Sequence, residues 1–150
     1  EKELLLWYQD HKDGVRNWDL RFKQLFGEPR TSKATHMAFL WVKPDDLMRP
    51  AYMPDVKSYD MRTAFEGELS NDAEISERMM WFKNWFDARA SKIYTGPDAR
   101  PWTRLGYTYD WGSKADKYGL TEFIVVPGAE MDVRFTRNLK FIANWMKDRK

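Results

Sequence analysis

The chain is organised around one stretch, residues 101–112, which reads PWTRLGYTYDWG. Its residues alternate with a period of two, which predicts a β-strand over 103–111. One face of this strand would carry the large apolar side chains Leu105, Tyr107, Tyr109 and Trp111. Three rings in a row need a second layer to cover them, so we expect this face to nucleate the core. The other face, with Arg104 and Asp110 towards its ends, would be a solvated surface or the floor of a shallow site.

The composition is that of a globular protein with an excess of aromatic side chains. The 150 residues are 43% hydrophobic and 32% charged, and this length predicts a single domain over 1–150. Eight tryptophans are many for such a chain. Because Trp is favoured at contact surfaces, we expect one or two of them to lie on one. Cysteine is absent, which excludes disulfides, thiolate metal sites and cysteine nucleophiles.

Charge and hydropathy argue against two classes of partner. The 25 basic and 23 acidic residues are well mixed and leave a net charge of +2. Nucleic-acid binding depends on clustered Lys and Arg, so we expect no nucleic-acid partner. No apolar run approaches the roughly 18 residues of a membrane span, so we expect no transmembrane segment. The chain starts at Glu1, which we interpret as a processed form, and a removed export signal is one explanation of that start.

Helical periodicity indicates helices near both ends and in the middle of the chain. Apolar residues recur at helical spacing over 3–11, 15–25, 75–93 and 137–150. The helix over 75–93 is the longest, and Asn71 with Glu74 resembles a capping box before it. Thr136 is the expected N-cap of the last helix. The buried face of that helix would consist of Leu139, Ile142, Ala143 and Met146.

Period-two patterns indicate strands over 35–42, 103–111, 120–126 and 130–136. Both faces of 35–42 are apolar, so we expect a central strand covered on both sides. Residues 126–129 read VPGA, the signature of a type II turn. Residues 49–70 show no sustained period and predict a long loop, with a short edge strand near 59–65. The predicted class is α+β, with an antiparallel sheet of about four strands that ends in a meander and is packed by one long central helix and the terminal helices.

Signatures of common catalytic chemistry are missing. There is no Gly-rich phosphate loop, no nucleophile elbow and no metal-binding His spacing. The two histidines are His11, on a helix face, and His36, on a strand that we expect to be buried, and both are interpreted as structural. His36 next to Met37 would suit copper, but most methionines occupy core-spaced positions. We therefore expect neither a metal nor another cofactor.

The aromatic stretch is the best candidate for a ligand-binding site. Flat rings flanked by polar groups suit sugar rings, peptide prolines or a protein partner. The candidate ligand-binding residues are Trp102, Arg104, Tyr107, Tyr109, Asp110 and Trp111. The loops 49–70 and 112–118 would lie beside them. The alternative is that Tyr107, Tyr109 and Trp111 belong to the core, and Trp102 is the ring that we expect to be exposed.

A catalytic alternative uses two carboxylates. Asp110 and Glu122 would face each other across the sheet as an acid/base pair, as in glycoside hydrolysis, with Arg104 and Tyr109 beside them. The structural interpretation is that Arg104 or Arg134 forms ion pairs with these acids on the solvent-exposed face of the sheet.

The PWTRLGYTYDWG segment also resembles a group of uncharacterised, exported proteobacterial proteins. The similarity extends to WF at 81–82 and 85–86, LFG at 25–27, WVKPDDLMRP at 41–50 and EF at 122–123. The resemblance implies a periplasmic or secreted bacterial protein and supplies no activity. It also implies a cysteine pair in the region of Ala51 and Met61, which this chain lacks.

The sequence therefore predicts a small exported, non-enzymatic binding or interaction domain that uses an aromatic-rich surface for a protein or glycan partner. The alternative is a hydrolase of envelope polymers that uses Asp110 or Glu122 with Arg104 and Tyr109. A third interpretation is a homo-oligomer whose subunit interface includes the exposed rings.

Overall fold

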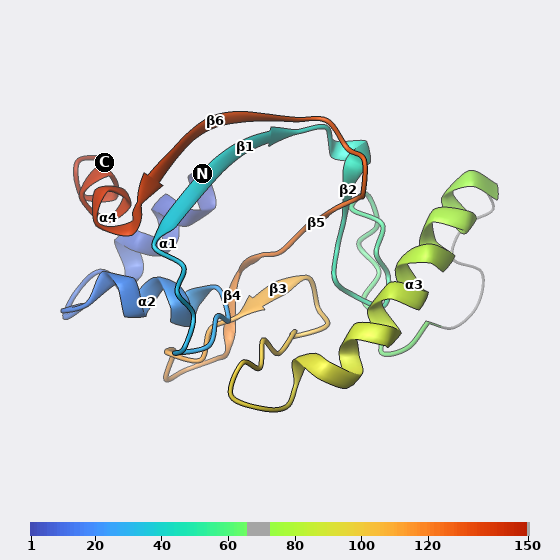
Figure 1. Cartoon of the computed structure of the whole chain (residues 1–150), viewed down its shortest axis with the longest axis horizontal. Helices are drawn as coiled ribbons and strands as arrows, with labels where there is room; N and C mark the ends of the chain where they lie inside the picture. The colour runs from blue at the N-terminus through green and yellow to red at the C-terminus, as the bar shows by residue number, and fades with distance from the viewer. Residues whose placement is uncertain (66–72, 150) are drawn as a thin grey trace.

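The computed structural model describes residues 1–65 and 73–149, and within the helix that begins at Ala73 it describes the side chains from residue 77 onward. Over these residues the chain is α+β, as predicted (Figure 1). The helices are α1 (Lys2–His11), α2 (Trp18–Leu25), η1 (Pro44–Asp46, a 3-10 helix), α3 (Ala73–Ile93) and α4 (Leu139–Lys147). The strands are β1 (His36–Val42), β2 (Leu47–Met48), β3 (Tyr107–Tyr109), β4 (Tyr118–Thr121), β5 (Ile124–Val125) and β6 (Met131–Asn138). The expected capping box of Asn71 and Glu74 rests on side chains outside the described ones.

The strands of the described chain form three two-stranded antiparallel sheets, β1–β6, β2–β5 and β3–β4. The expected meander does not form, because β4, β5 and β6 each pair with a different partner. The strand expected over 120–126 is interrupted at Glu122-Phe123. A turn does form at 126–129, where the N–H of Ala129 donates to the carbonyl of Val126 at 3.2 Å. Gly128 there has φ +83°, as the third position of a type II turn requires.

β1 and β6 form a long ribbon that arches over the rest of the molecule (Figure 1). The expectation that β1 is covered on both sides is wrong, because β6 is its only strand neighbour in the described chain and four of its seven residues are exposed. His36, expected to be buried, is exposed. The ribbon packs on the body near α4, where Phe39 stacks on Phe135 at 4.5 Å and meets Trp145 at 5.6 Å.

The first buried core lies among the terminal helices. α1, α2, α4 and β4 bury one contiguous apolar set: Leu4, Trp7, Tyr8, Phe22, Leu25, Leu120, Leu139, Ile142, Ala143 and Met146. The four α4 residues expected at this face are all among them. α4 begins two residues later than expected, because β6 continues to Asn138. Asn138, and not Thr136, is the N-cap, and its side-chain oxygen accepts from the N–H of Phe141 at 2.8 Å.

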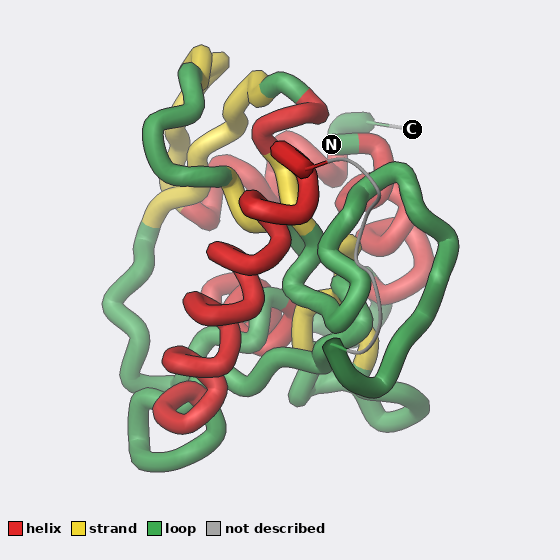
Figure 2. Tube along the Cα trace, turned by 90° about the vertical axis from the view of Figure 1, so that its right-hand side faces the viewer, coloured by secondary structure: helices red, strands yellow, loops and turns green. Residues whose placement is uncertain are grey.

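The second core lies along α3, the long helix that faces the viewer in Figure 2. Met79, Phe82 and Phe86 recur at helical spacing and are buried against Met48 and Met53. The segment from Arg49 to Phe65 covers this core as a loop, and the edge strand expected near 59–65 does not form. An isolated bridge between Ala51 and Leu105 ties the loop to the aromatic stretch.

The aromatic stretch forms a shorter strand than expected, and its faces are reversed. The chain turns at Arg104 and Gly106, whose φ angles are +63° and +77°, so that β3 covers only Tyr107–Tyr109. Period-two alternation holds over 107–110, but Thr108 and Asp110 are the buried side. The expectation that Tyr107 and Tyr109 nucleate the core is therefore wrong. The reason is that α2 supplies partners for the polar side, since the Thr108 hydroxyl donates to the carbonyl of Leu25 at 2.6 Å.

Candidate functional site

Arg104 holds the turn that precedes β3. Its Nε donates to the Tyr94 hydroxyl at 2.8 Å, and its Nη1 donates to the Tyr52 hydroxyl at 2.7 Å. The hydrogen bond to Tyr94, followed by that to Tyr52, raises the pKa of Arg104 above its ordinary value. Tyr94 in turn donates to the carbonyl of Trp102 at 3.0 Å. The positive φ of Arg104 is a strained conformation for a residue other than glycine, and these bonds stabilise it.

Trp102 lies between the second core and the surface. Its ring stacks on Trp85 at 5.2 Å and packs on Phe86 at 4.8 Å, and the residue is half-buried. One side of the ring therefore belongs to the core, and the expectation of an exposed ring is met only in part. Because its neighbours come from the rigid helix α3, the ring is fixed in orientation.

An open hollow of about 600 Å³ lies beside Trp102. Residues from the end of α3, the turn before β3 and the β3–β4 hairpin line it: Tyr94, Pro101, Trp102, Thr103, Leu105, Tyr109, Asp116, Lys117 and Tyr118. Tyr118 is 53% exposed, and its ring lies 6.2 Å from that of Tyr107, which is also exposed. Four aromatic side chains and two charged ones thus surround a single concavity.

The structure brings some of the candidate residues to this hollow and keeps others away from it. Trp102 and Tyr109 line it. Tyr107 does not, but its ring lies beside that of Tyr118, which is part of the lining. Arg104 does not line the hollow, but it donates a hydrogen bond to Tyr94, which does. The indole of Trp111 points elsewhere, since its Nε1 donates to the carbonyl of Glu28 at 3.0 Å.

Asp110 is buried in an ion pair. Its carboxylate accepts from both terminal nitrogens of Arg21, at 2.8 and 2.6 Å, and from the backbone N–H groups of Gly112 and Ser113 at 3.0 and 3.2 Å. The expected partner was Arg104 or Arg134, whereas the observed one comes from α2. With every bond satisfied inside the protein, Asp110 is a structural residue and is not available to a ligand.

Glu122 lies at the other end of the hairpin. The backbone N–H of Asp110 donates to the carbonyl of Lys117, whereas the backbone N–H of Glu122 donates to the carbonyl of Gly106. Gly106 and Asp110 flank β3 on its two sides, so Asp110 and Glu122 lie at opposite ends of the strand pair and do not face each other across it. Burial raises the pKa of Glu122 to about 7. The geometry therefore argues against Asp110 and Glu122 as an acid/base pair.

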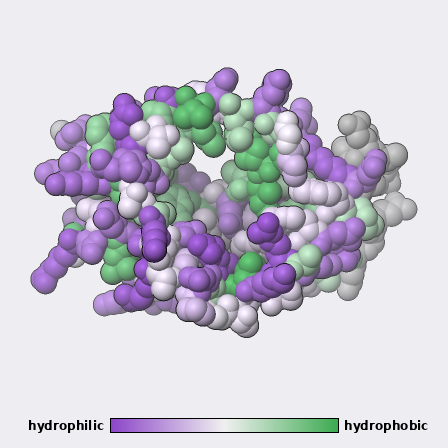
Figure 3. All heavy atoms as spheres, in the orientation of Figure 1, coloured by the Kyte–Doolittle hydropathy of each residue, from purple (hydrophilic) through white to green (hydrophobic). Residues whose placement is uncertain are grey.

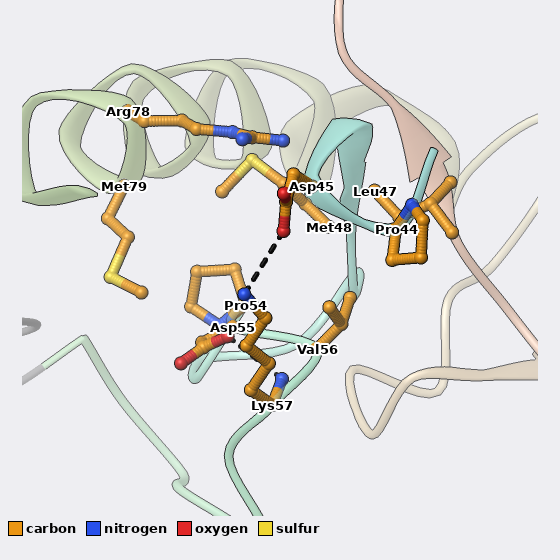
Figure 4. A pocket seen from close by; sticks show the side chains of 10 residues that line it. All are labelled: Pro44, Asp45, Leu47, Met48, Pro54, Asp55, Val56, Lys57, Arg78 and Met79. Carbon is orange, nitrogen blue, oxygen red and sulfur yellow. Dashed lines mark hydrogen bonds and ion pairs between the residues drawn. The ribbon is translucent and has the colours of Figure 1, made fainter. Parts of the chain in front are cut away.

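A second hollow, of about 400 Å³, lies between α3 and the loop after η1 (Figure 4). Asp45 and Lys57 form an exposed ion pair of 3.0 Å at its edge. Arg78 reaches into it from α3, and its Nη2 is buried without a hydrogen-bond partner in the described part of the chain. The loop expected beside the aromatic site thus lines this hollow, with Pro54 to Lys57, and contributes nothing to the lining of the other.

The histidines have no common site. His11 Nδ1 donates to the carbonyl of Trp7 at 2.8 Å, and its ring stacks on the Trp7 ring. His36 lies on the exposed side of β1. Over residues 1–65 and the described part of 73–149, no three His, Cys, Asp or Glu side chains are grouped so that they could hold a metal ion.

Sequence reasoning missed Tyr94 as a site residue and did not single out Asp116, Lys117 or Tyr118 within the loop. Tyr94 follows the last residue of α3. It joins the site because the chain folds back, so that its hydroxyl donates to the carbonyl of Trp102. The other three reach the hollow because Tyr118 pairs with Tyr109 across β3 and β4. The polar turn at 112–118 was the available signal, since a short hairpin loop sets its residues beside the preceding strand.

Comparison of the chain with protein-family models, with curated proteins and with solved structures finds no match. Among the helices in the described ranges, none is long and apolar enough to cross a membrane. The family resemblance drawn from the sequence stays a prediction, and function has to be argued from the site.

Proposed function

We propose that the protein is a non-enzymatic binding domain that holds a segment of a glycan in the hollow beside Trp102. The observation that carries the proposal is the lining of that hollow, in which the rings of Trp102, Tyr109 and Tyr118 lie with Asp116 and Lys117 around one concavity. The C–H faces of a sugar ring pack well on aromatic rings. A carboxylate and an ammonium group accept from and donate to sugar hydroxyls.

The size of the hollow supports this proposal. Its volume of about 600 Å³ falls within the roughly 300–1,000 Å³ of small-molecule sites. A protein partner that docks on a flat surface would not need such a concavity. Tyr118 presents a largely exposed ring at its edge, which a bound sugar would cover.

Preorganisation also supports it. The wall formed by Pro101 to Thr103 is held by the bond from Tyr94 to Trp102 and by the stacking of Trp102 on α3. A ligand that binds a preformed wall loses less conformational entropy than one that must order it. A periplasmic or secreted location is proposed with the function, and only the resemblance of residues 101–112 to exported proteins supports it.

Isothermal titration with the tetramer of N-acetylglucosamine tests the proposal. Tyr118→Ala removes an exposed ring from the hollow without opening a core, and we expect affinity to fall roughly tenfold, from the loss of about 1–1.5 kcal/mol of ring packing. Tyr59→Ala is the matched control, because Tyr59 is 99% exposed and does not line the hollow. Its affinity should equal that of the unaltered protein.

The same titration with a proline-rich peptide separates the glycan from a protein partner. Binding of the peptide in place of the tetramer, with the same loss in Tyr118→Ala, would assign the hollow to a protein ligand. Equal affinities of Tyr118→Ala and Tyr59→Ala for the tetramer, or no binding of either probe, would overturn the proposal.

A further inference from the structure

Arg78 of α3 lies beside two concavities without a counter-ion among the described side chains. It lines the hollow of about 400 Å³ between α3 and the loop after η1 (Figure 4). It also borders a smaller concavity of about 320 Å³, with Trp81, Val126 and Pro127. Its Nη2 is buried and has no hydrogen-bond acceptor in the described part of the chain. The group is therefore a cation that the fold holds in place and leaves unpaired.

A guanidinium group in this state should bind an anion more strongly than a fully hydrated one does. The fold already keeps water from Nη2, so an anion that reaches the group displaces less hydration. The free protein forms no hydrogen bond in exchange for this burial, and a buried donor without an acceptor is destabilising. A ligand that enters from either concavity would supply the negative charge that the site lacks.

The other charges of the larger hollow decide which anion fits. Its lining holds two cations, Arg78 and Lys57, and the two carboxylates of Asp45 and Asp55 balance them. Lys57 is engaged, because its Nζ pairs with Asp45 at 3.0 Å. A dianion such as a phosphate monoester would meet one uncommitted cation and the repulsion of two carboxylates. A single negative charge matches the one guanidinium group.

The rest of the lining is apolar. Met48 and Met79 are buried in the second core, so the wall that they form is fixed. Figure 3 shows apolar side chains gathered around β2 and β5, beside the more hydrophilic surface around α3. The volume falls within the roughly 300–1,000 Å³ of small-molecule sites. The apolar residues of the lining are Pro44, Leu47, Met48, Pro54, Val56 and Met79.

We propose that the hollow between α3 and the loop after η1 binds a small monocarboxylate with an aliphatic body. The carboxylate accepts from the guanidinium group of Arg78, whose planar fork of donors matches its two oxygens. The aliphatic body lies against Met79 and Val56, which remove it from water. No residue lines both this hollow and the one beside Trp102, so the site is independent of the proposed glycan site.

Titration of the full chain with hexanoate, followed by proton–nitrogen correlation spectra, tests the proposal. The backbone signals of Val56, Lys57 and Met79 should shift with a millimolar dissociation constant, as suits a ligand of this size. Hexanol has the same body without the charge, and hexyl phosphate carries a dianion on it. Each should bind at least about tenfold more weakly than hexanoate.

Two variants on opposite walls of the hollow locate the site. Arg78→Gln removes the charge and should weaken hexanoate binding at least about tenfold. Val56→Glu leaves α3 unchanged and adds a carboxylate to the loop wall, so it should weaken binding as much by repulsion. Arg89→Gln is the matched control on the same helix, because Arg89 is exposed over Trp85 and lines neither concavity. It should bind hexanoate as the unaltered protein does.

Absence of these shifts at hexanoate concentrations far above millimolar would overturn the proposal. So would hexanol or hexyl phosphate that binds as tightly as hexanoate. Unchanged hexanoate affinity in Arg78→Gln or Val56→Glu, with the variant folded by circular dichroism, would overturn it too. A loss in Tyr118→Ala equal to that in Arg78→Gln would place hexanoate in the hollow beside Trp102 and contradict the assignment.

Discussion

At the scale of single residues, Asp110 joins two parts of the chain that lie far apart in sequence. Its carboxylate accepts two hydrogen bonds from Arg21 and two from the loop that follows it. An ionised carboxylate tolerates burial only when its oxygens are bonded in this way. The pair therefore attaches α2 to the β3–β4 hairpin, and the hairpin carries half of the lining of the hollow.

We expect Asp110→Ala to lower the free energy of unfolding by about 3–5 kcal/mol, because it leaves the Arg21 guanidinium buried without its partner. Urea-induced unfolding measures this change. Asp45→Ala is the control, since its ion pair with Lys57 is largely exposed and should contribute less than about 1 kcal/mol. Similar losses in the two variants would contradict the assignment.

Glu122 predicts a pH dependence of stability. Burial raises its pKa from 4.5 to about 7, so between these values the folded state holds a proton that the unfolded state has released. The free energy of unfolding should therefore fall as pH rises from 4.5 to about 7, by up to about 3 kcal/mol. Below this window the carboxyl group is neutral in both states and contributes nothing.

Chemical denaturation of Glu122→Gln at pH 4 and pH 8 checks this dependence. The variant should match the unaltered protein at pH 4 and exceed it in stability at pH 8, since it has no charge to bury. Glu130→Gln, at an exposed carboxylate paired with Lys43, should leave the pH profile unchanged. An identical profile for Glu122→Gln and the unaltered protein would rule out the effect.

At the scale of elements, the start of α4 gives a direct comparison of two candidate caps. Asn138→Ala removes the side chain that accepts from the N–H of Phe141 and should cost about 1 kcal/mol. Thr136→Ala changes an exposed residue within β6 and should stay within about 0.5 kcal/mol. Thermal unfolding distinguishes them, and a larger effect of Thr136→Ala would show that the helix starts earlier.

The helices could be predicted from the sequence because their signals are local. Leu139, Ile142, Ala143 and Met146 fall on one face by spacing alone, and that face is buried. The strand around Tyr107 could not be oriented in this way. Which of its faces is buried depends on the carbonyl of Leu25 and on Arg21, more than 80 residues away, and a period of two does not distinguish the faces.

The candidate site was predicted in part for the same reason. Trp102 and Tyr109 lie within one conspicuous stretch and both line the hollow. Tyr94 and Tyr118 join them through the end of α3 and the pairing of β3 with β4, contacts that no local pattern encodes. The pairing of strands, unlike a helical face, is decided between distant segments.

At the scale of the whole molecule, the hollow lies between the segment that follows α3 and the β3–β4 hairpin. Tyr94 and Trp102 reach it from the core along α3, whereas Tyr109 and Tyr118 reach it from the hairpin that the terminal helices hold. Ligand sites are frequent at such junctions, because two packed bodies leave a concavity between them.

A ligand recognised in the hollow beside Trp102 would change the surroundings of the Trp102 indole. The eight tryptophans provide one indole N–H signal each in a proton–nitrogen correlation spectrum, and the signal lost in Trp102→Phe identifies Trp102. On addition of the N-acetylglucosamine tetramer, we predict that the Trp102 signal shifts while that of Trp7, buried in the core of the terminal helices, stays in place. A Trp102 signal that does not move at saturating tetramer would show that the hollow does not bind this glycan.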